Sequence, residues 1–149
     1  MALSDKEYLQ TNQALFSLAH AYESRMAEEE MRNTLGLRLS DCSVLMVLGQ
    51  FAPLNARRLS ELMDVNPGTI SVYVQRLVEM GLVQKAQDAE DRRNWWLTLT
   101  EAGQAAAQGV ISEAVEYTRD FLSALDEAER QTLHRLLLKA SHGLGFDWQ

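Results

Sequence analysis

Six basic side chains gather in residues 57–99, where six acidic side chains balance them. Arginine forks bind phosphate oxygens, and small polar side chains let a backbone approach base edges, so this mixture suits nucleic acid chemistry. The flanking segments are acidic, with four basic and seven acidic side chains in residues 1–56 and four and eight in residues 100–149. Any binding of nucleic acid must therefore depend on where the arginines lie, rather than on the net charge of −7.

The chain offers little to catalysis or to metal binding. No nucleophile–base pair and no carboxylate pair is visible, and His20, His134 and His142 are scattered. We therefore expect no enzyme activity, no metal and no cofactor. Cys42, the single cysteine, lies near the start of a predicted helix, where a thiol pKa can fall. A redox sensor is thus one alternative, although a small buried hydrophobe is the favoured interpretation.

Length and composition favour one helical domain that spans residues 1–149. Hydrophobic residues make up 46% of the chain, and only two prolines occur, which suits long helices. No apolar run reaches the roughly 18 residues of a membrane span. The first residues, MALSDKEYLQ, do not resemble a secretory signal, and one cysteine suits a reducing compartment. These features predict a cytoplasmic protein without a membrane partner.

Helical spacing predicts helices that bring the basic segment into position. One covers residues 5–32, and a second follows a predicted N-cap at Ser40-Asp41. A brief third helix covers residues 58–63, and a fourth starts at Asn66-Pro67 and stops at Gly81. The apolar stripe of the fourth helix is expected to be buried and consists of Ile70, Tyr73, Val74, Leu77 and Val78. Two further helices are expected after Thr100 and from Asp126.

The outward face of the fourth helix is small and polar near its start. Its members are Gly68, Thr69, Ser71, Val72 and Arg76. The first turns of a helix that enters the major groove reach base edges, so this face is a candidate reader of DNA. Val72 is apolar there, which a thymine methyl or an unseen protein contact would explain. Arg76 could bind a phosphate or pair with Glu79 or Glu61.

Two strands are predicted at residues 82–85 and 95–99, joined by a polar loop that ends in Asp91-Arg92-Arg93. One arginine can pair with Asp91 and stiffen the loop, which leaves the other for a minor groove or a phosphate. The sequence leaves open which arginine pairs with Asp91 and which one contacts DNA. Alternation sends Trp95 and Trp96 to opposite faces of the strand, and we expect both to be core residues under a covering helix.

Residues 39–103 resemble the MarR family of winged helix-turn-helix transcriptional regulators. The matching motifs are Leu39-Ser40, Asn66-Pro67-Gly68-Thr69-Ile70-Ser71, Arg76-Leu77, Gly81-Leu82-Val83, Asp88-Ala89-Glu90-Asp91-Arg92-Arg93 and Leu97-Thr98-Leu99-Thr100-Glu101-Ala102-Gly103. Each motif is weak alone, but together in this order they are specific. The chain departs from some members at Glu90, where they carry a basic residue, so wing contacts would rest on Arg92 and Arg93.

The resemblance implies a mainly α (α+β) fold and a homodimer. Residues 39–100 would form the winged helix-turn-helix, and residues 1–36 and 104–149 would supply dimerisation helices. Such proteins bind pseudo-palindromic operators and commonly repress genes. The expected DNA-binding residues are Arg57, Asn66, Gly68, Thr69, Ser71, Val72, Arg76, Arg92 and Arg93, with Asp91 as a brace of the wing.

Many family members release DNA when a phenolic or lipophilic ligand, or an oxidant, acts near the junction of the two parts. A pocket for a small aromatic or lipophilic effector is therefore expected where the first, second and fifth helices meet. Its candidate residues are Phe16, His20, Met46, Tyr117 and Phe121, for which ordinary core packing is the alternative. Two other functions remain open from the residues alone, namely a winged helix that binds protein, which suits the acidic total, and a cysteine-based redox regulator.

Overall fold

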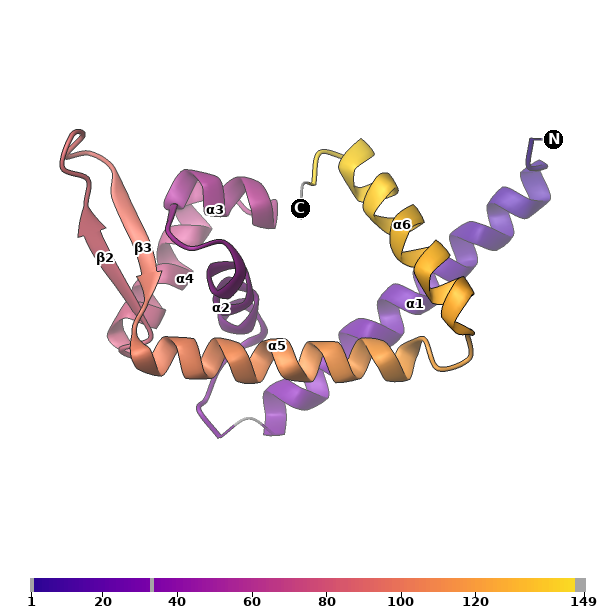
Figure 1. Cartoon of the computed structure of the whole chain (residues 1–149), viewed down its shortest axis with the longest axis horizontal. Coiled ribbons are helices and arrows are strands. Elements are labelled where there is room, and N and C mark those ends of the chain that lie inside the picture. The colour runs from indigo at the N-terminus through magenta and orange to yellow at the C-terminus, as the bar shows by residue number, and fades with distance from the viewer. Residues whose placement is uncertain (1, 33, 147–149) are drawn as a thin grey trace. The chain divides into compact units, whose positions relative to one another are not determined.

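The computed structural model describes residues 2–32 and 34–146, which divide into two compact units, 1–39 and 40–149 (Figure 1). The first unit consists mainly of one long helix, and the second contains a small sheet and the remaining helices. In chain order the elements are α1 (Asp5–Arg32), α2 (Leu39–Phe51), β1 (Leu54–Asn55), α3 (Ala56–Met63), α4 (Pro67–Glu79), β2 (Val83–Gln87), β3 (Trp95–Leu99), α5 (Glu101–Phe121) and α6 (Glu127–Gly143). The mainly α fold with a small sheet is confirmed.

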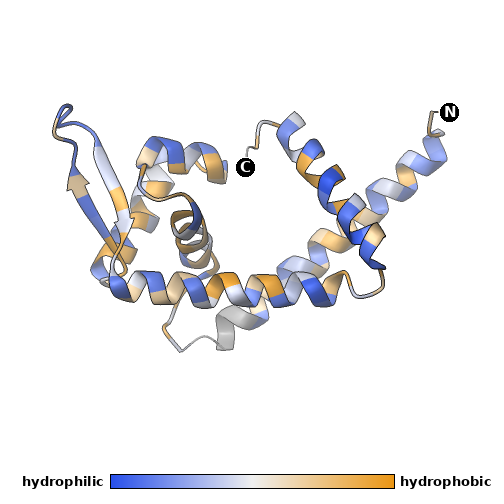
Figure 2. Ribbon diagram, viewed as in Figure 1, coloured by the Kyte–Doolittle hydropathy of each residue, from blue (hydrophilic) through white to orange (hydrophobic). Residues whose placement is uncertain are grey.

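The core of the second unit lies where α2, α3 and α4 pack with the sheet. Its fully buried apolar side chains are Val44, Leu45, Leu48, Leu59, Ile70, Val74, Leu77 and Leu97. Helix α2 is hydrophobic along most of its length (Figure 2). The predicted stripe of α4 is confirmed at its centre, but Tyr73 and Val78 are only half-buried.

The predicted cap at Ser40-Asp41 is wrong, because α2 already begins at Leu39. The carboxylate of Asp41 lies inside the first turn and is 0% exposed. An aspartate near a helix start is usually a solvated cap, so only a tertiary partner explains its burial.

Short capping contacts define the helix–turn–helix. The Asn55 side chain accepts the backbone N–H of Arg58 at 2.8 Å and starts α3 two residues earlier than predicted. At the end of α3, Asp64 has φ 51°, a left-handed conformation that reverses the chain. The Asn66 side chain then accepts the backbone N–H of Thr69 at 2.9 Å, and Pro67 occupies the first turn of α4 as predicted.

The sheet has three strands in the order β1-β3-β2, all antiparallel. Only β2 and β3 were expected. Strand β1 has two residues, too few for an alternating pattern, and it pairs Leu54 with Leu97 and Asn55 with Trp96. It closes one edge of β3 beside the start of α3, while the β2–β3 hairpin projects beyond the helices (Figure 1).

The tryptophans of β3 do not form the expected pair of core side chains. Trp95 is 46% exposed, and Trp96 is half-buried. They do lie on opposite faces, but this end of the strand belongs to the β2–β3 hairpin, which projects beyond the helices (Figure 1). Strand alternation was therefore a sound guide to direction and a poor guide to burial.

Thr100 and Gly103 join the end of the sheet to α5. The Thr100 hydroxyl donates to the Gly81 carbonyl at 2.6 Å and accepts the Gly103 N–H at 3.0 Å, while the Thr100 N–H donates to the Leu82 carbonyl at 3.1 Å. A Cβ at Gly103 would lie 1.8 Å from the Leu82 oxygen, so only glycine fits.

The last helix starts as predicted, directly after Asp126. The Asp126 side chain accepts the Glu129 N–H at 2.9 Å, and the Glu129 side chain accepts the Asp126 N–H at 2.9 Å, which makes a capping box. None of the described residues of α6 is buried. No helix in the described part of the chain has a stretch both long and apolar enough to span a membrane.

Candidate nucleic-acid interface

The start of α4 presents a small and open surface. Gly68 and Ser71 are exposed, Thr69 is half-buried, and Val72 is 67% exposed, as expected of an outward face. The Ser71 hydroxyl donates to the Pro67 carbonyl at 2.9 Å, so its oxygen remains available only as an acceptor. The Asn66 side chain caps the helix. Backbone and small side chains can therefore approach a groove floor here without a bulky obstacle.

The Arg76 side chain points away from this surface and pairs with the carboxylate of Asp41, a partner that the sequence did not suggest. Its Nε lies 3.0 Å from Oδ2 of Asp41, whose side chain is fully buried, whereas the Arg76 side chain is 33% exposed. The carboxylate recorded at Arg76 is that of Asp41, whereas the sequence suggested Glu79 or Glu61. The pair joins the first turn of α2 to α4 across 35 residues of sequence, and such a long-range contact has no local signature in the sequence.

Asp88 organises the loop between β2 and β3. Its Oδ1 accepts the backbone N–H groups of Glu90 at 2.7 Å and Asp91 at 3.0 Å, and its Oδ2 accepts the Trp96 indole N–H at 2.6 Å. The N–H donors, that of Asp91 first, then those of Glu90 and Trp96, hold the pKa of Asp88 below its ordinary value of 3.8. This residue was missed as a brace, although an aspartate that precedes two polar residues is typical of such a turn.

Asp91 braces the wing as well, and it does so through Arg93. Its Oδ1 accepts the Arg93 backbone N–H at 3.0 Å and lies 3.5 Å from the Arg93 Nε. Arg92 is exposed, and no carboxylate partner is recorded for it among the described residues. The structure thus separates two arginines that the sequence left equivalent.

The predicted effector residues divide between the two units. Phe16 is 74% exposed and His20 is exposed in the first unit, while Met46, Tyr117 and Phe121 belong to the second, where Tyr117 is buried and the others are half-buried. Their common pocket stays a prediction.

Metal binding and the single cysteine are two further chemical questions that the sequence raised. Within the described residues, no group of three His, Cys, Asp or Glu side chains is arranged to hold a metal ion. Cys42 is half-buried, rather than the buried hydrophobe that was expected.

Comparisons with known proteins agree with this architecture. The model of the MarR family matches residues 35–94. An uncharacterized HTH-type transcriptional regulator of Bacillus cereus is 27% identical over 118 residues, which cover 78% of each chain. The putative transcriptional regulatory protein for the hcr operon of Thauera aromatica is 32% identical over 94 residues, or 63% of this chain and 57% of that protein.

Solved structures share the fold. A probable transcriptional regulator from Pseudomonas aeruginosa is 29% identical, with a TM-score of 0.70 over 88% of this chain and 98% of that one. A MarR family protein from Bacillus stearothermophilus is 19% identical, with a TM-score of 0.81 over 97% and 99%. The fold and the open face of α4 define a winged helix-turn-helix protein. The match over residues 35–94 and the similar regulators identify its winged helix-turn-helix as one of the MarR type.

Proposed function

We propose that this DNA-binding regulator binds a pseudo-palindromic operator as a homodimer and represses the adjacent genes. The α4 helices of two protomers would enter successive major grooves about 34–36 Å apart. The observation that carries this proposal is the capped and unobstructed start of α4, where Gly68 and Val72 are exposed. The proposal places the protein in the cytoplasm with its operator and gives it no catalytic reaction.

In this arrangement the reading surface consists of four α4 residues: Gly68, Thr69, Ser71 and Val72. The exposed methyl groups of Val72 suit a thymine methyl, and the Ser71 oxygen suits a base donor. Arg57 suits a phosphate, because its exposed pair with Glu61 is worth at most about 1 kcal/mol and gives way easily. Arg76 can still meet a phosphate through its exposed part, but its main role is to position α4.

The wing contributes phosphate or minor-groove contacts through Arg92 and Arg93. Arg92 is available without the loss of an ion pair, whereas Arg93 also stiffens the loop through Asp91. We expect Arg92→Ala to weaken binding to all duplexes and to flatten its salt dependence, since phosphate contacts carry little sequence information.

Dimerisation is supported by apolar side chains that each unit leaves in solvent. On α1 these are Tyr8, Leu9, Leu15, Phe16 and Leu18, and on α6 they are Leu136 and Leu137, all between 48% and 74% exposed. A lone chain rarely exposes so many large apolar side chains on two helices. Residues 1–36 and 104–149 are therefore proposed to supply the dimer interface.

A small aromatic or lipophilic effector is proposed to release the operator. Its proposed contact residues are Phe16, His20, Met46, Tyr117 and Phe121. The support is the side-chain chemistry, which is aromatic and flexible.

Selection of bound duplexes from a random pool, followed by footprinting, tests the proposal. The expected result is an inverted repeat with protected half-sites one helical turn apart. Thr69→Ala and Val72→Ala should change the selected sequence, while Glu113→Gln on α5 should not. A wild-type protein that enriches no sequence, or an unchanged preference in both α4 variants, would contradict the reading model.

A further inference from the structure

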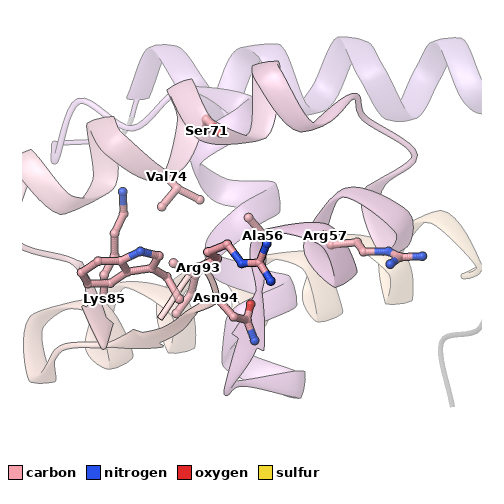
Figure 3. A pocket seen from close by; sticks show the side chains of 9 residues that line it. Ala56, Arg57, Ser71, Val74, Lys85, Arg93 and Asn94 are labelled. Carbon is pink, nitrogen blue, oxygen red and sulfur yellow. The ribbon is translucent and has the colours of Figure 1, made fainter. Parts of the chain in front are cut away.

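A hollow of about 580 Å³ opens between α3, α4 and the β2–β3 hairpin (Figure 3). Its floor is apolar, formed by Val74 and Leu97. Around the floor lie Ala56, Arg57, Ser71, Lys85, Arg93, Asn94 and Trp95. Three of these described lining residues are cations, and none is a carboxylate. The hollow is therefore a positively charged recess beside the reading face of α4.

Strand register explains why Lys85 and Trp95 belong to this recess. Lys85 is paired with Leu97 across the β2–β3 ladder, and Gln87 is paired with Trp95. Paired residues and residues two apart share one face of a sheet. Because Leu97 is 2% exposed and points into the core, Lys85 and Trp95 must lie on the same face, which looks toward α4. The Lys85 Nζ accordingly reaches to 3.5 Å from Oε1 of Gln75 on that helix.

The charge of Lys85 is less compensated than that of its neighbours. Arg57 pairs with Glu61 at 3.2 Å, and Arg93 pairs with Asp91 at 3.5 Å. The partner recorded for Lys85 among the described residues is the neutral amide of Gln75. An ammonium group beside two other cations attracts an anion, and a phosphodiester is the anion that the proposed function brings to this face.

We infer that the hollow holds one backbone phosphate of the operator in each half-site. Lys85 binds the phosphate oxygens, with Arg57 and Arg93 at the rim, and the exposed indole of Trp95 packs against the neighbouring deoxyribose. This inference rests on the proposed function and adds Lys85 and Trp95 to the contacts expected from the sequence. Because its walls come from α3, α4 and the wing together, one phosphate contact sets the register of all three on the duplex.

Charge removal at Lys85 tests the inference. Binding to the selected duplex and to a random-sequence duplex is measured by fluorescence anisotropy between 50 and 300 mM KCl. For Lys85→Gln the slope of log K against log salt should fall by about 0.9 per protomer, with the ratio of the two affinities unchanged. Arg38→Gln, which removes an equal charge outside the proposed DNA contacts and dimer segments, should leave the slope unchanged.

Two further arms separate a phosphate contact from a structural role. Gln75→Ala removes the protein partner of Lys85 and should keep the wild-type slope. Single methylphosphonates are then placed along the duplex. A methylphosphonate at one position should lower the affinity of the wild type and should not lower the affinity of Lys85→Gln any further. Equal effects at every position in both proteins would overturn the inference.

The indole is tested by fluorescence. Trp95→Leu should abolish most of the fluorescence change that DNA causes, whereas Trp96→Phe should retain it, and the reverse result would contradict the sugar contact. A wild-type protein that binds no duplex would overturn the proposed function together with this inference. Wild-type binding with an unchanged slope in Lys85→Gln would overturn the inference alone.

Discussion

Among the glycines, Gly103 has the least room for a side chain. The Leu82 oxygen that a Cβ would meet at 1.8 Å belongs to the backbone and already accepts the Thr100 N–H, so it cannot move aside cheaply. We expect Gly103→Ala to lower the free energy of unfolding by more than the roughly 1–3 kcal/mol of ordinary overpacking. Urea titration followed by circular dichroism measures the change.

Gly109 provides the matched control on the same helix. A Cβ there meets nothing within 4 Å, and the residue is exposed. Gly109→Ala should therefore raise the free energy of unfolding by about 1 kcal/mol, since alanine favours a helix over glycine. Equal effects of the two substitutions would show that α5 does not approach Leu82 as described.

Asp88 makes the wing sensitive to acid. Its folded pKa is lowered, chiefly by the Asp91 N–H, so the carboxylate contributes stability above the ordinary pKa of 3.8 and loses it as the pH falls through the lower folded value. Asp88→Asn should thus be less stable than the wild type at neutral pH, and the difference should shrink below pH 3.8.

The NMR signal of the Trp96 indole N–H reports the same event locally, because this group donates to Asp88. It should shift in the wild type as the pH falls below 3.8 and should remain insensitive in Asp88→Asn. A stability difference between the two proteins that stays constant down to the lowest pH would argue against the carboxylate as brace.

At the scale of elements, the Asp41–Arg76 ion pair joins α4 to α2. Arg76→Ala leaves a buried carboxylate without its guanidinium, which should cost about 3 kcal/mol of unfolding free energy. Arg58→Ala breaks the exposed pair with Glu61, whose atoms lie 3.3 Å apart, and should cost less than about 1 kcal/mol. Thermal unfolding measures the loss of stability in each variant. Similar losses in Arg76→Ala and Arg58→Ala would mean that burial does not strengthen the Asp41–Arg76 pair.

The sequence predicted a helix or strand well wherever the signals that define it lie within that segment. The Asn66-Pro67 start, the stop at Gly81 and the run 95–99 all fall where expected, because caps, positive φ and β-branched or aromatic content act within a few residues. Strand β1 was missed since two residues carry no period. Asp41 was misread because its partner is distant in sequence, and Trp95 because alternation does not reveal which part of a sheet is covered.

For the whole molecule, the exposed apolar side chains of α6 predict an oligomer. Light scattering coupled to size exclusion should give about twice the chain mass of 16.8 kDa at micromolar concentration. The double variant Leu136→Lys and Leu137→Lys should be a monomer. Its operator binding should be greatly weakened, because a monomer can contact only one of the two half-sites.

The fold should survive this double substitution, since α6 buries none of its described residues. Unchanged circular dichroism would establish that. Gln131→Lys adds a charge to α6 away from the two leucines, at a side chain that binds Glu127, and should leave the dimer intact. A wild-type monomer, or a double variant that still dimerises, would contradict the proposed interface.

The junction at Thr100 gives α5 a mechanical role. Thr100 binds two successive carbonyls just after α4, and Gly103 presses the first turn of α5 against the same backbone. The 21 residues of α5 form a rod about 30 Å long, and its first turn is held at the end of α4 and at the base of the β2–β3 hairpin. A few degrees of tilt at the far end of α5 would therefore turn together the two parts that we propose to contact DNA, α4 and the hairpin.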